Sequence, residues 1–319
     1  MRFLWWKKLD KYSKIFLVCS LIEAILLIVN QIIRILEFRN NKSRLIEEHI
    51  DLYAILFFLG VVYAGIYVFI IIKFKNIFQL VSFAIVNVML TIYAIYELVL
   101  NRSSLATLVF LLVVVLIYDA FYTFMLIRLY KEFTWDFWNR VGSQPLIQKL
   151  FKVWSIFLTI LGLDLMFSSA FLIADCYFLW SDYSKESYID IALIIILIFW
   201  GILGYYCFRD ENTKLMGLFL FSSLFEIAYL IAKIALFTHR KKLKNQLTPI
   251  SVLIILTAVI LLLRIFLWII CIIGYRNFGL GLKARLTRDY IPISPESNSN
   301  KNRLEIMMDG SGEDSDDFN

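Results

Sequence analysis

Long apolar runs separated by short polar or basic segments constrain this chain more than any other feature. Each run is close to the ~20 residues that a helix needs to cross a hydrocarbon core at ~1.5 Å per residue. Eight runs are present, at residues 15–36, 52–72, 77–100, 105–129, 153–180, 189–208, 215–237 and 250–274. Only helices and closed barrels satisfy every backbone polar group in lipid. Because the runs are continuously apolar, they predict an all-α polytopic transmembrane helix bundle of about eight spans.

The composition supports this class and leaves little chain for a soluble domain. Hydrophobic residues make up 61% of the sequence, against about 45–50% in typical soluble domains. The longest polar stretch follows the last run and is rich in Ser, Asn and acidic residues, which is typical of disorder. We therefore predict a transmembrane helix bundle over residues 1–284 and a disordered, acidic, cytosolic tail over residues 285–319.

Lys and Arg are unevenly divided between the two sets of loops. With the N-terminus placed in the cytosol, the cytosolic segments contain 20 of these residues and the opposite loops contain 9. Because cytosolic loops have an excess of Lys and Arg, this distribution favours a cytosolic location for both termini. The loop at residues 238–249 is an exception to this distribution, since its four basic residues fall on the non-cytosolic side.

Ionisable residues inside the predicted spans are the sharpest chemical signal, because such residues are rare and are functional candidates by default. Five of them lie roughly 12–17 Å from the cytosolic ends of their spans, at ~1.5 Å per residue. They form a predicted midplane polar cluster of Glu23, Asp119, Asp164, Glu226 and Arg264. An unpaired Arg in lipid is costly. We therefore predict that Arg264 pairs with at least one of Asp119, Asp164 or Glu226.

Two interpretations of this cluster stay open. It is either a structural polar network that fixes the register of the helices, or a site for a proton, a cation or a polar solute. Asp175 and Lys233 are further ionisable residues within spans. Asp175 shares a helix face with Asp164, because eleven residues make almost three turns. Lys233 lies near the non-cytosolic end of its span, so we expect it to snorkel to the interface.

Catalytic motifs are not apparent in the sequence. It contains no GxSxG, HExxH or Walker pattern. His49 and His239 fall in different predicted loops, and the four cysteines have no metal-ligand spacing. We therefore predict a protein that is not an enzyme, with no catalytic residue, no cofactor, no metal site and no nucleic-acid partner.

The segment at residues 130–141, between the fourth and fifth runs, has an amphipathic pattern. At about 100° per residue, one side holds Phe133, Phe137, Trp138 and Val141. Polar residues occupy the other side, and aromatic side chains suit the headgroup region. We predict a short interfacial amphipathic helix. It would act either as an elbow between two spans or as a helix that binds a partner.

The same segment begins a series of motifs that extends to the end of the last run. It opens with Tyr130, Lys131, Glu132, Phe133, Thr134 and Trp135, and continues with Gly142, the basic residues Lys149 and Lys152, and Asp164 in a Leu-Asp-Leu sequence. Residues 277–283 read Asn-Phe-Gly-Leu-Gly-Leu-Lys.

In this order, over roughly residues 130–283, the chain resembles a fungal family of uncharacterised multi-pass Golgi apparatus membrane proteins. The departures from the family pattern are Thr134 in place of Gly, and Ser143-Gln144 in place of Ala-Asp, which weaken the match at the turn. The resemblance implies a Golgi address without assigned chemistry. It makes Tyr130, Lys131, Glu132, Phe133, Trp135 and Gly142 the family-motif residues.

The predicted tail contains two short patterns. Tyr290 and Ile293 fit a Tyr-x-x-apolar sorting motif, which predicts a sorting adaptor as partner. Ser311 and Ser315 stand among acidic residues, as in the substrates of acidophilic kinases, and are candidate phosphorylation sites. The alternative is a solvated tail with no partner.

Three functions stay open at this point. The first is a non-enzymatic role in trafficking, scaffolding or membrane organisation in the Golgi, with the lipid bilayer as the main partner. The second is a transporter or channel for a proton, a cation or a small polar solute that uses the midplane charges. The third is an enzyme that modifies lipids within the membrane.

Overall fold

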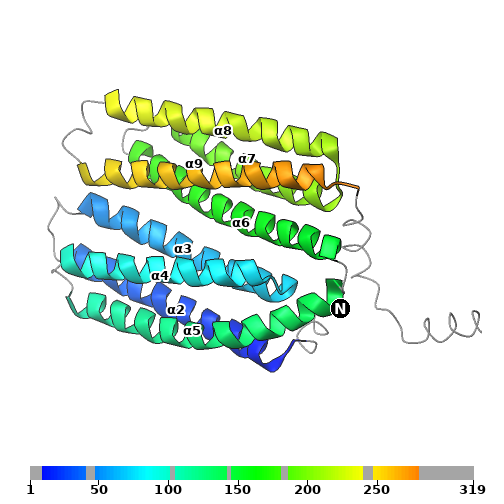
Figure 1. The fold of residues 1–319 in the computed structure, drawn as a ribbon. Helices are drawn as coiled ribbons and strands as arrows, with labels where there is room; N and C mark the ends of the chain where they lie inside the picture. Colours follow the sequence, from blue (N-terminus) through cyan, green and yellow to red (C-terminus); the bar gives the residue numbers. More distant parts are fainter. Residues whose placement is uncertain are drawn as a thin grey trace, which may run out of the picture.

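The computed structural model describes residues 9–40, 47–100, 105–141, 145–180, 186–239 and 247–279. Within these residues the chain forms eight helices and no strand (Figure 1). They are α2 (Lys11–Asn40), α3 (Glu47–Phe74), α4 (Ile77–Leu100), α5 (Leu105–Val141), α6 (Pro145–Trp180), α7 (Glu186–Arg209), α8 (Thr213–His239) and α9 (Leu247–Arg276). The predicted all-α class is confirmed. Five predicted site residues lie outside the described residues: Gly142, Tyr290, Ile293, Ser311 and Ser315.

Seven of the described helices are long and apolar enough to cross a membrane, so the chain is a multi-pass membrane protein. α4 covers the third predicted run, residues 77–100. It has 24 residues and is about 36 Å long at 1.5 Å per residue, but the apolar stretch described within it, Ile77–Ile92, is shorter than the others.

The distribution of side chains is inverted relative to that of a soluble protein, and this supports contact with lipid. Large apolar side chains cover the outside of the helices, with Phe199 67% exposed and Phe225 66% exposed. The interior instead holds charged groups such as Arg264, which is 1% exposed, and Asp164, which is fully buried. Charged side chains are almost never fully buried unless they are paired. The interior charges therefore identify the candidate site.

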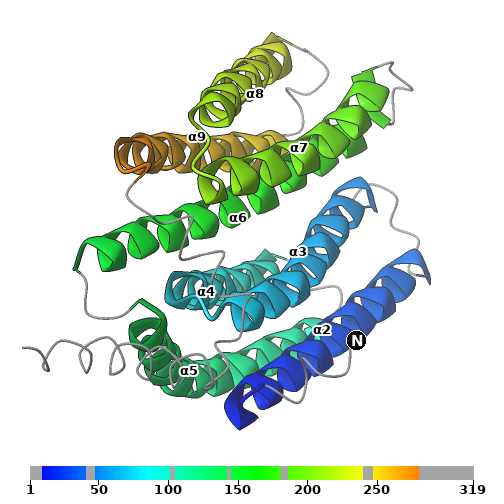
Figure 2. The same cartoon turned by 90° about the vertical axis from the view of Figure 1, so that its right-hand side faces the viewer.

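The described helices form two four-helix bundles that lie one above the other in Figure 2. In the first bundle, α2 packs on α3 and α5, and α4 packs on α3 and α5. In the second, α6 packs on α7 and α9, and α8 packs on α7 and α9. α6 also packs on α3 and α4, so it joins the two bundles. Both bundles therefore have an up-down-up-down topology, although the sequence shows no repeat.

Aromatic rings fill much of the second bundle, and glycines let its helices approach. Phe157 stacks on Phe208 with a centroid distance of 4.6 Å. A Cβ atom at Gly274 would lie 2.4 Å from Phe208, and one at Gly204 would lie 2.6 Å from Phe219. Small residues at such positions permit close contact between membrane helices. The bundle around the buried charges is therefore tightly packed.

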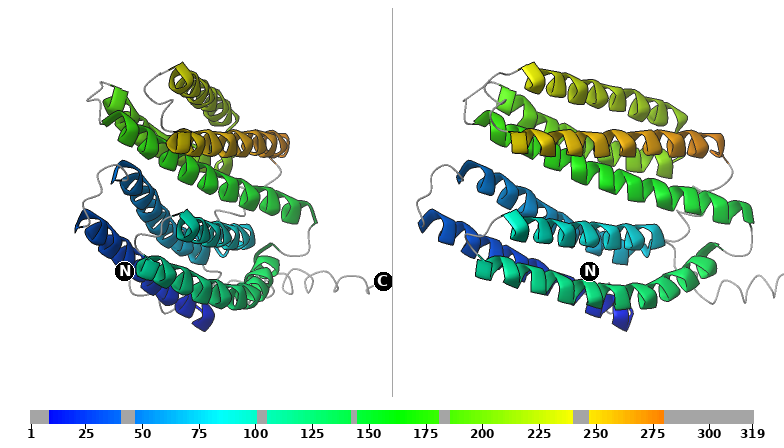
Figure 3. Two further views of the ribbon diagram at one scale, coloured as in Figure 1. Left: turned by 90° about the vertical axis from the view of Figure 1, so that its left-hand side faces the viewer. Right: turned by 60° about the vertical axis from the view of Figure 1, so that its left-hand side comes forward.

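Residues 130–141 are helical as predicted, but they are the end of α5 and not a short helix of their own. These residues continue α5 without a break, and the end of α5 bends toward the start of α6 (Figure 3). Phe133 is fully buried in the core of the first bundle, whereas Trp135 is 69% exposed and Trp138 is 49% exposed. One side of these last residues of α5, here named the α5 extension, packs on protein, with Phe133 in the core of the first bundle and Phe137 against Phe151 of α6.

Candidate functional site: a buried polar axis in the second bundle

A line of polar side chains, here named the polar axis, runs through the centre of the second bundle. α6 and α8 each pack on α7 and α9, so they stand diagonally across the bundle. Residues three, four and seven apart share a helix face, and such a face of each helix is polar. α6 contributes Asp164, Ser168 and Asp175, and α8 contributes Glu226, Tyr229 and Lys233. The polar axis contains two ionic groups.

The first group, the Arg264 group, consists of Arg264, Asp164, Glu226 and Trp200. The Nη2 atom of Arg264 lies 2.8 Å from Oδ2 of Asp164 and also contacts Oε2 of Glu226. Its guanidinium carbon lies 3.9 Å from the centre of the Trp200 ring, in a cation–π contact. The predicted pairing of Arg264 with an acid is confirmed. All four helices of the second bundle contribute a side chain to this group.

Neighbouring residues fix the orientation of the Arg264 group. The Trp200 indole donates a hydrogen bond from Nε1 to the Phe219 carbonyl over 3.3 Å and stacks on the Phe219 ring at 4.4 Å. The Trp268 indole donates from Nε1 to Oγ of Ser223 over 2.8 Å, which joins α9 to α8. Phe219 therefore fixes the Trp200 ring that contacts Arg264, and Trp268 fixes α9 against α8.

The second group, the Lys233 group, consists of Lys233, Asp175, Asp190 and Tyr229. The Nζ atom of Lys233 lies 2.7 Å from Oδ2 of Asp175 and 3.4 Å from Oδ1 of Asp190. The Tyr229 hydroxyl is within hydrogen-bond reach of the same two carboxylate oxygens. Both Asp side chains are fully buried. The expected snorkelling of Lys233 is wrong, because two acids inside the bundle offer its ammonium a counter-charge.

Glu23 and Asp119 do not belong to either group, so the predicted single cluster of five residues is wrong. Both lie in the first bundle, on α2 and α5. The Tyr122 hydroxyl donates to Glu23, and the Thr91 hydroxyl donates to Asp119. Depth along a helix is readable from sequence, but the assignment of each helix to a bundle is not. Of the three acids predicted as partners, Arg264 therefore contacts Asp164 and Glu226 but not Asp119.

A third ionic group, the Lys75 junction, lies at the end of the first bundle where α3 turns into α4. Lys75 has a positive φ of 50° and pairs with Asp10 at 2.9 Å and with Asp136 of the α5 extension. Burial acts to lower the pKa of Lys75, but hydrogen bonds to Asp136 and Asp10 outweigh burial and raise this pKa. Hydrogen bonding with Glu132, and then with Lys75, lowers the pKa of Asp10. The junction thus ties the α5 extension to the start of α2.

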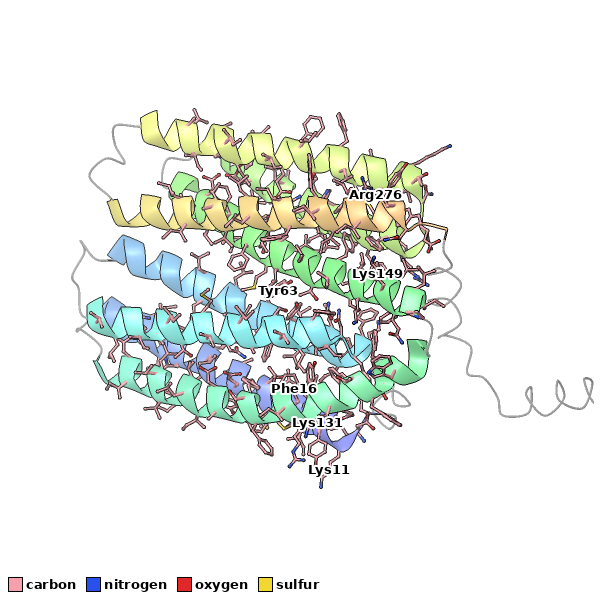
Figure 4. The ribbon with its side chains drawn as sticks, viewed as in Figure 1. Lys11, Phe16, Tyr63, Lys131, Lys149 and Arg276 are labelled. Atoms are coloured by element: carbon pink, nitrogen blue, oxygen red, sulfur yellow. The ribbon has the colours of Figure 1, made fainter. Side chains whose placement is uncertain are left out.

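The family-motif residues divide between core and surface. Phe133 is fully buried, Glu132 is half-buried near Asp10, and Tyr130, Lys131 and Trp135 are exposed. The basic residues Lys11, Lys131, Lys149 and Arg276 all lie toward the end of the molecule where α2 begins and α9 ends (Figure 4). The motif therefore combines a structural anchor with an exposed aromatic and basic surface.

Sequence reasoning missed Asp190, Trp200 and Tyr229. Asp190 is the second residue of its apolar run, a position where an acid normally faces water. Trp200 and Tyr229 looked like ordinary span residues, because aromatic side chains are common in membrane helices. The spacing of Tyr229 from Glu226 and Lys233, three and four residues, was a signal that could have placed it on the same helix face.

Among the described residues, no His, Cys, Asp and Glu side chains are grouped so that three of them could hold a metal ion. Comparison of the chain with protein-family models, with curated proteins and with solved structures found no match. The function must therefore be inferred from the polar axis and from the sequence motifs.

Proposed function

We propose that this chain is a non-enzymatic, multi-pass protein of the Golgi membrane that serves trafficking, scaffolding or membrane organisation as a rigid helical body. The supporting observation is that each cation of the polar axis binds acids from two other helices. Arg264 of α9 contacts α6 and α8, and Lys233 of α8 contacts α6 and α7. Such contacts fix helix register. They brace the second bundle against the relative helix motion that a transport cycle requires.

The Golgi address is supported by the motif resemblance, and the cytosolic location of both termini by the distribution of Lys and Arg. The clustering of basic side chains at one end of the molecule agrees with that orientation (Figure 4). The test is co-localisation of the tagged chain with Golgi markers, together with a C-terminal topology reporter. A lumenal reporter signal or residence in another membrane would contradict this proposal.

The tail is proposed to contribute to the address through Tyr290 and Ile293, with Ser311 and Ser315 as phosphorylation sites. Deletion of residues 290–319 should then mislocalise the protein, and Tyr290→Ala should reproduce the effect. If the truncated chain still co-localises with Golgi markers, the sorting motif is wrong while the address itself stands.

The second candidate function is transport of a proton, a cation or a small polar solute. It is favoured by a specific observation: each ionic group of the polar axis places two acids around one base, so full ionisation would leave a surplus negative charge in a buried position. Intramembrane acids of this kind mark ion and proton pathways in other membrane proteins. Solute flux through the purified chain in liposomes separates the two functions.

A further inference from the structure

We propose that the Lys233 group is a proton-binding site, in which one extra proton is shared by Asp175, Asp190 and Tyr229. This proton is additional to those of the Lys233 ammonium and the Tyr229 hydroxyl. The proposal goes beyond a scaffold role, and it does not require any net transport across the membrane.

The first argument is a count of hydrogen atoms. The Tyr229 oxygen lies 3.2 Å from Oδ2 of Asp175 and also contacts Oδ1 of Asp190. A phenol has one hydrogen, so it can donate to only one of these two oxygens. The other contact is a hydrogen bond only if that carboxyl is protonated and donates to the phenol oxygen. The geometry therefore calls for one more proton than ionised acids would supply.

The second argument is charge. Asp175 and Asp190 are fully buried, and the only base that contacts them among the described residues is Lys233. Asp175 Oδ1 and Asp190 Oδ2 accept no hydrogen bond from the described residues. A buried charge without a partner is expensive. One extra proton makes the group neutral overall, with one ionised and one protonated acid beside the ammonium.

The other described Lys and Arg residues of α6, α7 and α8 lie at the opposite ends of these helices, at Lys149, Lys152, Arg209 and Lys214. On α6, the Cys176 thiol is close enough to interact with both acids and with Lys233. On α9, the described charged residues are Arg264, which is paired in the Arg264 group, and Arg276, which lies at the opposite end of the helix. These neighbours supply no second positive charge to the Lys233 group.

The ligand is assigned as a proton because of the position of the ammonium. The Lys233 Nζ atom, at 2.7 Å and 3.4 Å from the two carboxylates, fills the place that a metal cation would take. The extra proton would also have only a short distance to cross to reach water. Asp175, Asp190 and Lys233 lie four to six residues from the ends of their helices, which is roughly 6–9 Å at 1.5 Å per residue. The proton would exchange with the side of the membrane opposite the termini.

The test is infrared spectroscopy of the full chain in lipid nanodiscs as the pH is changed. We expect a carbonyl-stretch band from a protonated carboxylic acid that declines as the pH rises. This component should be missing from Asp190→Asn and from Asp175→Asn, because each variant leaves one acid for one base. The exposed acid variant Asp210→Asn is the matched control and should keep the band. An unchanged band in both buried-acid variants would overturn the proposal.

The Tyr229→Phe variant keeps the test valid if the Asn variants do not fold, because it removes only the hydroxyl that shares the proton. We expect the band to change frequency and its pH midpoint to shift. The same band and midpoint as in the unaltered chain would contradict the shared proton. A carboxyl band that does not change with pH but does change when sodium ions are added, and not when choline is added, would show a cation site. That result would also overturn the assignment of a proton.

Discussion

Removal of the guanidinium in Arg264→Leu tests whether the Arg264 group stabilises the second bundle. Arg264 is 1% exposed and Asp164 is fully buried, whereas the side chain of Glu226 is 23% exposed. The variant leaves the Asp164 carboxylate buried without its counter-charge. Breaking a buried ion pair from one side costs about 3–5 kcal/mol of unfolding free energy. Glu226 also loses its counter-charge, and the exposed part of its side chain faces lipid rather than water because the residue lies near the predicted midplane of its span.

The assay is unfolding of the purified chain by SDS in mixed micelles. The matched control is Arg276→Leu, an exposed position on the same helix, which should change stability by less than about 0.5 kcal/mol. A triple variant with Leu at 264, 164 and 226 removes both the base and its acids. It should recover most of the loss, because apolar replacement of a whole buried pair is often neutral or stabilising. A stabilising role of the Arg264 group is contradicted if Arg264→Leu loses no more stability than Arg276→Leu, or if the triple variant is no more stable than the single one.

Three further variants test the packing around the site, each by the same unfolding assay. Phe133→Ala should lower the free energy of unfolding by about 3–5 kcal/mol, as for other buried Phe residues. Trp135→Ala, at an exposed position, should leave stability nearly unchanged, and equal effects of the two variants would contradict the burial of Phe133. Lys75→Ala should lose about 1–2 kcal/mol, because a partly buried cation with two acids exceeds a surface pair, and an unchanged midpoint would refute a role for the junction. Gly204→Val should lose about 1–3 kcal/mol by overpacking against Phe219, whereas Gly65→Val meets open space and should be tolerated.

The helices were predictable from sequence because lipid imposes a simple rule on backbone hydrogen bonds. The run at residues 153–180, for example, lies within α6. The helix itself begins earlier, at Pro145, because its first two turns include polar residues that do not count toward an apolar run. The pairing of Arg264 was also predictable, since a lone cation near the midplane of a membrane is costly whichever helix holds it. What depth could not give was the partner, because Asp119 and Glu226 lie at similar depths in different bundles.

The Lys233 group shows a second limit. Lys233 is close enough to a helix end to snorkel, and the choice between water and a buried acid depends on where α6 and α7 stand around α8. Asp190 was missed for the same reason, since a position near a helix end predicts solvent contact until neighbouring helices are placed. The α5 extension shows a third limit. An amphipathic pattern identifies an apolar face of a helix but does not say whether lipid or protein covers that face.

Proton flux measures most directly whether the polar axis is a brace or a pathway. The purified full chain is reconstituted in liposomes that contain a pH-sensitive dye, and a proton gradient is imposed with potassium and valinomycin to balance charge. A braced scaffold predicts a flux equal to that of protein-free liposomes, and equal again for the variant Asp164→Asn/Glu226→Gln. A faster flux through the unaltered chain that this variant abolishes would contradict the scaffold and establish transport through the Arg264 group.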